Sequence, residues 1–264
     1  MKTRRILMVL ALSAALFGRA EAAPATLTLA CEDRENYPAV MGEGGDIAPR
    51  NPGLSIELLN LVGKDLGIRI SFIRLPWNRC KNELRYGKVD GIFDTGYAPE
   101  ERMIGVFPMK AGAPDPERRM NMVSFAVYVV KGSGVSWDGG YFSPKTLRIG
   151  VPMGYSVAGD IRRLGIAVEE SPGIETGFRK LAYGRINAFV APESAGDHLK
   201  KARSKDFPSI IRLDKPFTTQ PFYLMFSHQF YSRNRALAEA IWEAVAVLRE
   251  SEPMRAAAAR YGKL

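Results

Sequence analysis

The sequence holds few of the residues on which metal sites and covalent catalysis depend. Its 264 residues include two cysteines and two histidines. Because His198 and His228 stand in separate segments, the chain shows neither a zinc-binding spacing nor the parts of a serine triad. We therefore expect no metal and no cofactor, and we do not expect an enzyme.

Long apolar runs are also scarce. Basic residues at positions 2, 4 and 5 precede the apolar run Ile6–Phe17, and the small-x-small sequence Ala20-Glu21-Ala22 follows. This order is typical of a secretory signal peptide, here residues 1–22, whose apolar run is too short to cross a bilayer. No cysteine follows the cleavage site to carry a lipid anchor, and no later stretch is apolar for long enough to span a membrane. We expect the mature protein to be soluble in the periplasm.

Basic residues outnumber acidic ones, but they form no run. Lysine and arginine number 37 against 28 acidic residues, which gives a formal net charge of +9, and the leader contributes +3 of it. A basic protein can bind nucleic acid, yet the export signal and the lack of a basic run argue against that partner. We expect these charges to be solvated on the surface, with at most a modest preference for anionic solutes.

The stretch Leu75–Arg102 concentrates the signals for a binding site. Trp77 and Leu84 fall at helical spacing, and Gly87 supplies the left-handed residue that ends a helix. A short apolar strand follows and leads into the polar loop Asp94–Pro99. In an open α/β sheet, ligands lie outside the carboxyl ends of the strands, so we expect the site at this loop.

A near copy of this module recurs downstream. Leu84–Phe93 and Leu181–Val190 share the order apolar, Tyr-Gly, basic, β-branched, Asp or Asn, small, then two apolar residues. Helix and strand patterns alternate through the mature chain, as in the helical pattern of Leu54–Leu66, and such alternation favours parallel sheets. We predict an α/β fold of two lobes with a parallel or mixed sheet in each and a cleft between them.

The chain is expected to cross between the lobes twice. Residues 23–123 form the first part of the first lobe, residues 124–217 form the second lobe, and residues 218–264 return to the first lobe with its closing helices. The two cysteines belong to the first lobe. Cys31 ends the first strand and Cys80 lies in the first turn of the helix after the second, so both lie at the same end of the lobe. Two buried thiols are one interpretation; we predict a disulfide, which an oxidising compartment permits.

Residues spread over the whole mature chain carry a family resemblance. They are the Tyr37-Pro38 loop, the helix start Gly53–Leu58, the paired Tyr-Gly-basic segments and the terminal Tyr261-Gly262. Together with the signal peptide, they resemble family 3 periplasmic solute-binding proteins, the receptors of polar amino acid ABC importers. The resemblance implies a Venus-flytrap fold that holds a small-molecule solute between its lobes and delivers it to a membrane permease. We expect a monomer.

The resemblance also assigns ligand contacts. In that family a segment rich in serine and threonine ends in an arginine that clamps the ligand carboxylate, which makes Arg102 the anchor here. Thr95 falls on a hydroxyl position of that segment, whereas Tyr97 falls on another and does not match. A Gly-Thr-Thr turn of the second lobe is replaced by Gly154-Tyr155-Ser156, so only Ser156 retains the hydroxyl. Alternatively, Arg102 pairs with a neighbouring acid on a solvated helix.

The ammonium-binding aspartate of the family has no direct counterpart. Its position is occupied by Pro192, and Glu193 follows one place later. An ammonium in a dry cleft needs a carboxylate partner, so recognition of an α-amino group depends on Glu193 turning inward. A glutamate at a helix start is also explained by the helix dipole.

Other residues of the expected cleft suit a different ligand. Tyr37, Trp77, Tyr97 and Tyr155 would offer apolar walls to an aromatic or organic acid. Asp94, at the start of the polar loop, is either a ligand contact or a loop cap.

Three functions from different classes follow from these patterns. The leading one is an extracytoplasmic receptor that captures a small carboxylate-bearing solute, an amino acid or related organic acid, for ABC-type import. The second is a partner protein of a sensor or an exported dehydrogenase, which the lost hydroxyls and the Pro-rich stretch 111–116 favour. The third is a periplasmic dehydratase-type enzyme with Glu193 and Arg102 in acid–base roles.

Overall fold

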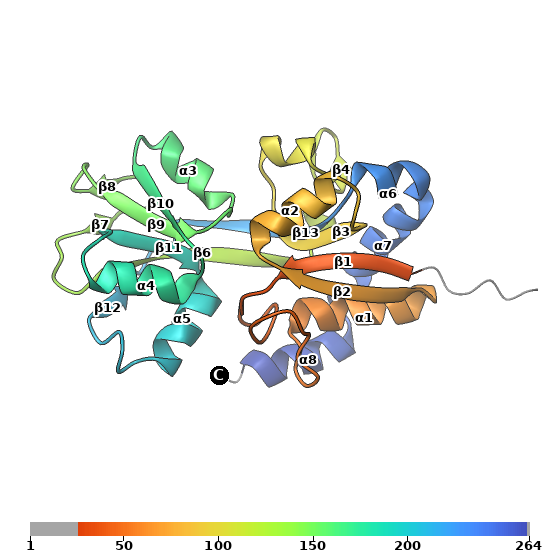
Figure 1. Ribbon diagram of the computed structural model, residues 1–264, viewed down its shortest axis with the longest axis horizontal. Coiled ribbons are helices and arrows are strands. Elements are labelled where there is room, and N and C mark those ends of the chain that lie inside the picture. The colour runs from red at the N-terminus through yellow and green to blue at the C-terminus, as the bar shows by residue number, and fades with distance from the viewer. Residues whose placement is uncertain (1–25, 263–264) are drawn as a thin grey trace, which may run out of the picture.

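The computed structural model describes residues 26–262, so the expected signal peptide lies outside the described residues. Figure 1 shows two lobes joined by the long strands β6 (Asn121–Val130) and β13 (Thr218–Phe226), which both run from one lobe into the other. No helix within residues 26–262 is both long and apolar enough to cross a membrane.

The first lobe combines the beginning and the end of the described chain. Its main elements are β1 (Thr26–Glu32), α1 (Leu54–Leu66), β2 (Arg69–Leu75), α2 (Trp77–Arg85), β3 (Gly91–Gly96), α6 (His228–Arg233), α7 (Arg235–Leu248) and α8 (Glu252–Gly262). Shorter ones are the 3-10 helices η1 (Pro99–Met103) and η2 (Pro116–Arg118) and the hairpin of β4 (Met109–Lys110) and β5 (Ala113–Pro114), which forms in the Pro-rich stretch.

The second lobe is built from the middle of the chain. Its elements are β7 (Ser136–Trp137), β8 (Phe142–Ser143), β9 (Arg148–Pro152), α3 (Val157–Arg163), β10 (Ala167–Ser171), α4 (Ile174–Ala182), β11 (Ala188–Pro192), α5 (Glu193–Ala202) and β12 (Ile210–Arg212). The helical pattern of Leu54–Leu66 predicts α1 with the bounds that the structure has.

One mixed sheet passes through both lobes. Its strand order is β10-β9-β11-β6-β13-β3-β1-β2, and β12 pairs with β6 as a ninth strand. The outer strands of each lobe pair in parallel, β2-β1-β3 on one side and β10-β9-β11 on the other, whereas β6 and β13 are antiparallel to their neighbours. Parallel pairs need crossover helices, which the alternating segments supply, and the two connecting strands make the sheet mixed.

The repeated sequence module is a repeated structure. In each lobe a helix ends before a left-handed glycine, Gly87 with φ 65° and Gly184 with φ 68°, and a buried strand follows. The side chains of Asp90 and Asn187 each accept a 2.8 Å hydrogen bond from a backbone N–H of the neighbouring parallel strand. This bond explains why both copies carry Asp or Asn at this position.

The expected disulfide between Cys31 and Cys80 is absent, and both residues are free, buried thiols. The Cys80 side chain lies against the Cys31 backbone, because the Cys80 thiol donates to the Cys31 carbonyl oxygen at 3.2 Å. Side chains alternate along β1: Cys31 packs with Leu29 against the side of the sheet that α1 covers, whereas Cys80 packs beside Ala30 on the side that α2 covers. The prediction of the disulfide was wrong because it considered only that both residues lie at the same end of the lobe. It did not consider that their side chains lie on opposite faces of the sheet.

Candidate functional site

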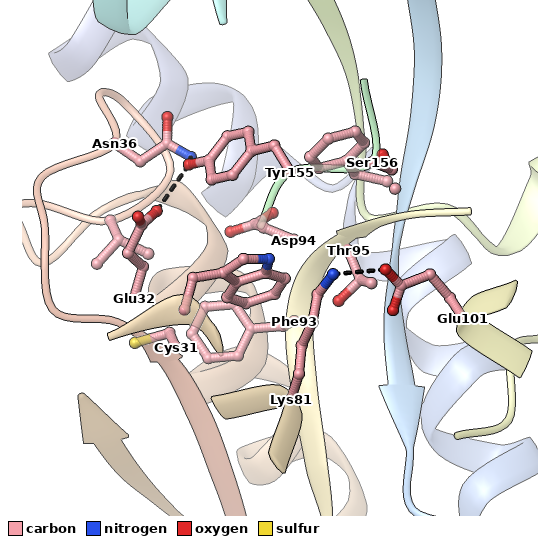
Figure 2. Close-up of a pocket in the computed structure, with 14 residues that line it drawn as sticks. Cys31, Glu32, Asn36, Lys81, Phe93, Asp94, Thr95, Glu101, Tyr155 and Ser156 are labelled. Atoms are coloured by element: carbon pink, nitrogen blue, oxygen red, sulfur yellow. Dashed lines mark hydrogen bonds and ion pairs between the residues drawn. The ribbon is translucent and has the colours of Figure 1, made fainter. Parts of the chain in front are cut away.

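A narrow pocket lies between the lobes, where the carboxyl ends of β1 and β3 meet the turn that leads into α3 (Figure 2). It is called the first pocket here and is lined by Cys31, Glu32, Asn36, Val40, Trp77, Lys81, Phe93, Asp94, Thr95, Gly96, Glu101, Tyr155, Ser156 and Phe222. The space left between these side chains is about 30 Å³. One water needs roughly 10–15 Å³ measured in this way, so the two lobes lie close together at this pocket.

Glu32 and Tyr155 connect the two lobes across this pocket. Glu32 ends β1, and Tyr155 precedes α3; the Tyr155 hydroxyl donates a 2.6 Å hydrogen bond to Oε2 of Glu32. The Asn36 amide lies 3.5 Å from the same hydroxyl (Figure 2). Burial raises the pKa of Glu32 to about 7, although the bond from Tyr155 opposes the rise.

Lys81 makes the second connection. Its ammonium lies 2.5 Å from Oε1 of Glu101 in η1 and donates a 2.8 Å bond to the Gly154 carbonyl oxygen of the second lobe. The centroid of the Trp77 ring lies 5.8 Å from the same nitrogen. Only 17% of the Lys81 side chain and 13% of the Glu101 side chain are exposed. A close, sheltered ion pair holds Lys81, so its charge is already balanced within the protein.

Asp94 sits where β3 becomes irregular. Its φ is 56°, a left-handed conformation that Asp tolerates better than most residues. Oδ1 accepts hydrogen bonds from the Ser55 hydroxyl at 2.9 Å and the Asn121 amide at 2.8 Å, whereas Oδ2 is buried and has no partner among the described residues. Burial raises the pKa of Asp94 to about 6, against the lowering effect of these two bonds. The hydroxyl of the adjacent Thr95 is likewise buried without a partner in the described part of the chain.

A second pocket of about 230 Å³ continues from the first. Both pockets are lined by Asn36, Asp94 and Phe222, so Asp94 stands at their junction. The rest of the second pocket is lined by Tyr37, Pro38, Ala39, Leu54, Asn121, Met122, Val123, Ser124, Pro192, Glu193 and Ser194. This lining is mostly apolar, which suits the carbon skeleton of a ligand.

The first pocket brings together five of the residues singled out from the sequence. They are Trp77, Asp94, Thr95, Tyr155 and Ser156. Ser156 makes no capping hydrogen bond to α3. It packs instead against the first lobe, since a methyl group on Gly96 would lie 2.7 Å from its hydroxyl oxygen. The lobes therefore touch at Gly96, where no larger side chain fits.

Tyr37 and Glu193 line the second pocket rather than the first. The Tyr37 ring stacks on His198 of the second lobe, with ring centroids 4.1 Å apart. Glu193 forms an ion pair with Arg212, which leaves it a weaker candidate for an ammonium anchor than Asp94.

Arg102 and Tyr97 line neither pocket. Arg102 is exposed on η1, and its side chain forms no ion pair with any residue in the described range 26–262. In a 3-10 helix, successive side chains point about 120° apart, and the preceding Glu101 takes the position that faces the pocket. Tyr97 packs edge-on against Phe107 inside the first lobe, with centroids 5.3 Å apart. The structure thus contains a Lys81–Glu101 pair where the sequence led us to expect an arginine anchor.

Sequence reasoning missed Glu32, Lys81 and Glu101. Glu32 could have been predicted from the sequence, because it ends β1, which is parallel to β3, and the carboxyl ends of parallel strands share one edge of a sheet. Lys81 and Glu101 had no such signal, since their meeting depends on how α2 and η1 pack. Within residues 26–262 no group of three or more His, Cys, Asp or Glu side chains is arranged to hold a metal ion.

Comparison with known proteins identifies the fold. Neither a protein-family model nor a curated protein matches the sequence. Among solved structures, a histidine kinase sensor domain with similarity to periplasmic binding proteins has a TM-score of 0.70 and 15% identity, covering 90% of this chain and 96% of that one. An ancestral arginine-binding protein bound to arginine has a TM-score of 0.67 and 17% identity, covering 90% and 99%. The substrate-binding protein of an amino acid ABC transporter has a TM-score of 0.66 and 16% identity, covering 91% and 100%.

These matches confirm the expected fold. The chain has the two-lobe fold of periplasmic binding proteins, the Venus-flytrap arrangement, with a mixed α/β sheet.

Proposed function

We propose that this protein is an extracytoplasmic solute-binding receptor that closes its lobes on one small polar solute and delivers it to a membrane permease of the ABC type. The observation that carries the proposal is the first pocket, because both lobes contribute polar side chains to it. Tyr155 and Lys81 make hydrogen bonds across the cleft at the pocket itself. A ligand that places a polar group in this pocket would contact the same groups that hold the lobes together, which couples binding to closure.

The ligand was expected to carry a carboxylate, and the pocket gives this part of the expectation little support. Arg102 is exposed, and Lys81 is paired with Glu101. An amino acid or organic acid would therefore rely on neutral donors, such as the hydroxyl of Ser156, to hold its carboxylate.

A sensing role is the second candidate. A structural neighbour is the sensor domain of a histidine kinase, and the same closure would serve a membrane sensor as well as a permease. The dehydratase-type alternative loses its proposed acid–base pair, because Glu193 is bound to Arg212 and Arg102 is exposed.

Native mass spectrometry of the protein recovered from the periplasm tests the proposal. We expect a stoichiometric small molecule that denaturation releases. Titration calorimetry should show that it rebinds, and small-angle X-ray scattering should show that rebinding lowers the radius of gyration. A folded protein that carries no ligand and binds none of a panel of amino acids, amines and organic acids would contradict it. Loss of ligand uptake in a deletion strain supports import, whereas intact uptake with a lost transcriptional response supports sensing.

A further inference from the structure

Four buried polar atoms without hydrogen-bond partners gather around the junction of the two pockets. Among the described residues they are Oδ2 of Asp94, Oγ1 of Thr95, Oδ1 of Asn121 and Nε2 of Gln220. Asn121 is bonded to Asp94 at 2.8 Å, and a methyl group on Gly96 would lie 3.3 Å from the Gln220 nitrogen. Buried polar groups are nearly always paired, so their grouping at one place points to a ligand that supplies the partners.

The chemistry of these atoms identifies what the ligand must bring. Asp94 Oδ2, when ionised, and Asn121 Oδ1 only accept hydrogen bonds, while the Thr95 hydroxyl can accept as well. The ligand must therefore present several N–H or O–H donors at the junction. Gln220 Nε2 only donates, so it needs one acceptor from the ligand. A bound carboxylate would satisfy Gln220 but would meet the Asp94 and Asn121 oxygens as an unfavourable acceptor.

The charges around the first pocket also favour a ligand that brings N–H donors, namely a cation. The first pocket is lined by the acids Glu32, Asp94 and Glu101, and Lys81 is the only Lys or Arg among the described residues that line it. Because Lys81 is bound to Glu101, Glu32 and Asp94 have no cationic partner there. Carboxylates in a sheltered site attract a cation more strongly than they would in water.

The second pocket offers no cationic side chain to an anion among the described residues. None of the described residues that line it is a lysine or an arginine. Its volume of about 230 Å³ continues from Asp94 between the apolar side chains of Leu54, Met122 and Phe222. A short carbon chain attached to a cationic head at the junction would fit this shape, whereas a carboxylate at the far end would have no charged partner.

Resting on the proposed function, we infer that the solute is a small organic cation, an amine or a guanidine, whose charged group binds at Asp94 and Thr95 and which needs no carboxylate. The competing explanation is that Asp94 serves only the first lobe, where it ties Ser55 and Asn121 to β3. The two explanations differ in what a neutral side chain at position 94 does to ligand binding.

Titration calorimetry with matched probes tests the inference. The probes are 1,4-diaminobutane, agmatine, L-arginine and succinate; agmatine and L-arginine share a guanidinium and differ in the carboxylate. We expect at least one of the two carboxylate-free cations to bind, L-arginine to bind no tighter than agmatine, and succinate not to bind. The inference is overturned if succinate binds more tightly than every cation, or if L-arginine binds at least tenfold more tightly than agmatine. Either result leaves the proposed function standing. If no probe binds and native mass spectrometry finds no ligand, the proposed function itself fails; a co-purified ligand without a basic nitrogen overturns only the inference.

Variants then locate the charged group. Asp94→Asn keeps an oxygen for Ser55 and Asn121 and tolerates the positive φ, but it removes the charge, so affinity for the cation should fall roughly 10- to 100-fold. Thr95→Val removes only the hydroxyl and should cost about tenfold. Asp65→Asn, an exposed change on α1 of the same chemical type, is the matched control and should bind as the wild type does. Unchanged affinity in both Asp94→Asn and Thr95→Val overturns the placement; should Asp94→Asn not fold, Thr95→Val decides.

Discussion

The Tyr155 hydroxyl of the second lobe donates a 2.6 Å hydrogen bond to the Glu32 carboxylate of the first. These residues lie 123 positions apart in sequence and both line the first pocket. Since the bond crosses the cleft at the place where a solute would bind, it links the closed arrangement of the lobes to the chemistry of the site.

Tyr155→Phe should weaken both closure and ligand binding. The variant keeps the ring but leaves the Glu32 carboxylate without its donor, and a hydrogen bond to a charged group contributes about 1.5–3 kcal/mol. We expect affinity for the co-purified ligand to fall by roughly one to two orders of magnitude. Titration calorimetry measures the affinity, and small-angle scattering should show a larger radius of gyration. Tyr141→Phe is the control, because that side chain is 80% exposed; equal affinities in both variants would show that the cross-lobe bond is dispensable.

Gly96→Ala should hold the lobes apart. In the closed arrangement the added methyl group would lie 2.7 Å from the Ser156 hydroxyl oxygen and 2.9 Å from the Phe222 ring. Overpacking of this kind usually costs about 1–3 kcal/mol, and opening the cleft relieves the contact with Ser156. Scattering with saturating ligand should report incomplete closure. Gly45→Ala, where a methyl group meets nothing within 4 Å, should close normally; full closure of both variants would contradict the tight approach of the lobes at Gly96.

The two cysteines should titrate as free thiols. Protein denatured without reductant should release two thiols per chain, and reductant should leave the melting temperature unchanged. In the native state both should react slowly, because burial raises the pKa of Cys80 to about 12 and that of Cys31 further still, which suppresses the thiolate. A thiol count of zero would show that the two side chains reach each other after all and that β1 presents Cys31 differently.

The stability of the ligand-free protein should fall between acidic and slightly alkaline pH. Burial raises the pKa of Glu32 from 4.5 to about 7 and that of Asp94 from 3.8 to about 6. The folded state therefore keeps protons that the unfolded state has released, so this contribution is fully present below pH 4 and is lost as the pH rises through 6 and 7.

Urea unfolding at pH 5 and pH 8 measures this effect. Each pKa unit corresponds to about 1.4 kcal/mol, so the wild type should lose at least about 1 kcal/mol more than the double variant Glu32→Gln/Asp94→Asn, which lacks both titrating groups. Parallel losses in the two proteins would show that other groups set the pH dependence. A bound cation should make the free energy of unfolding of the wild type depend less on pH, since the cation favours the ionised carboxylates.

Much of the local structure was predictable because its causes are local. The periodicity of Leu54–Leu66 and the glycine after it define α1, and the repeated Tyr-Gly segments define a helix, a left-handed turn and a buried strand in each lobe. Asp94 and Thr95 could be placed at the first pocket from sequence, because the carboxyl end of β3 is a property of strand order. The same rule would have reached Glu32 at the end of β1.

The sequence by itself therefore determined α1, the repeated helix, turn and strand of each lobe, the two-lobe plan and the edge of the sheet at which we expect a ligand. Only the tertiary structure decided which side chains face the pocket. A shift of one residue in η1 exchanges Glu101 for exposed Arg102, and the alternation of β1 turns Cys31 away from Cys80. The orientation of these side chains depends on how elements far apart in sequence pack, because the face that an element buries is set by its neighbours in space. The sequence led us to expect an arginine anchor for a carboxylate, whereas the packing lines the first pocket with three carboxylates.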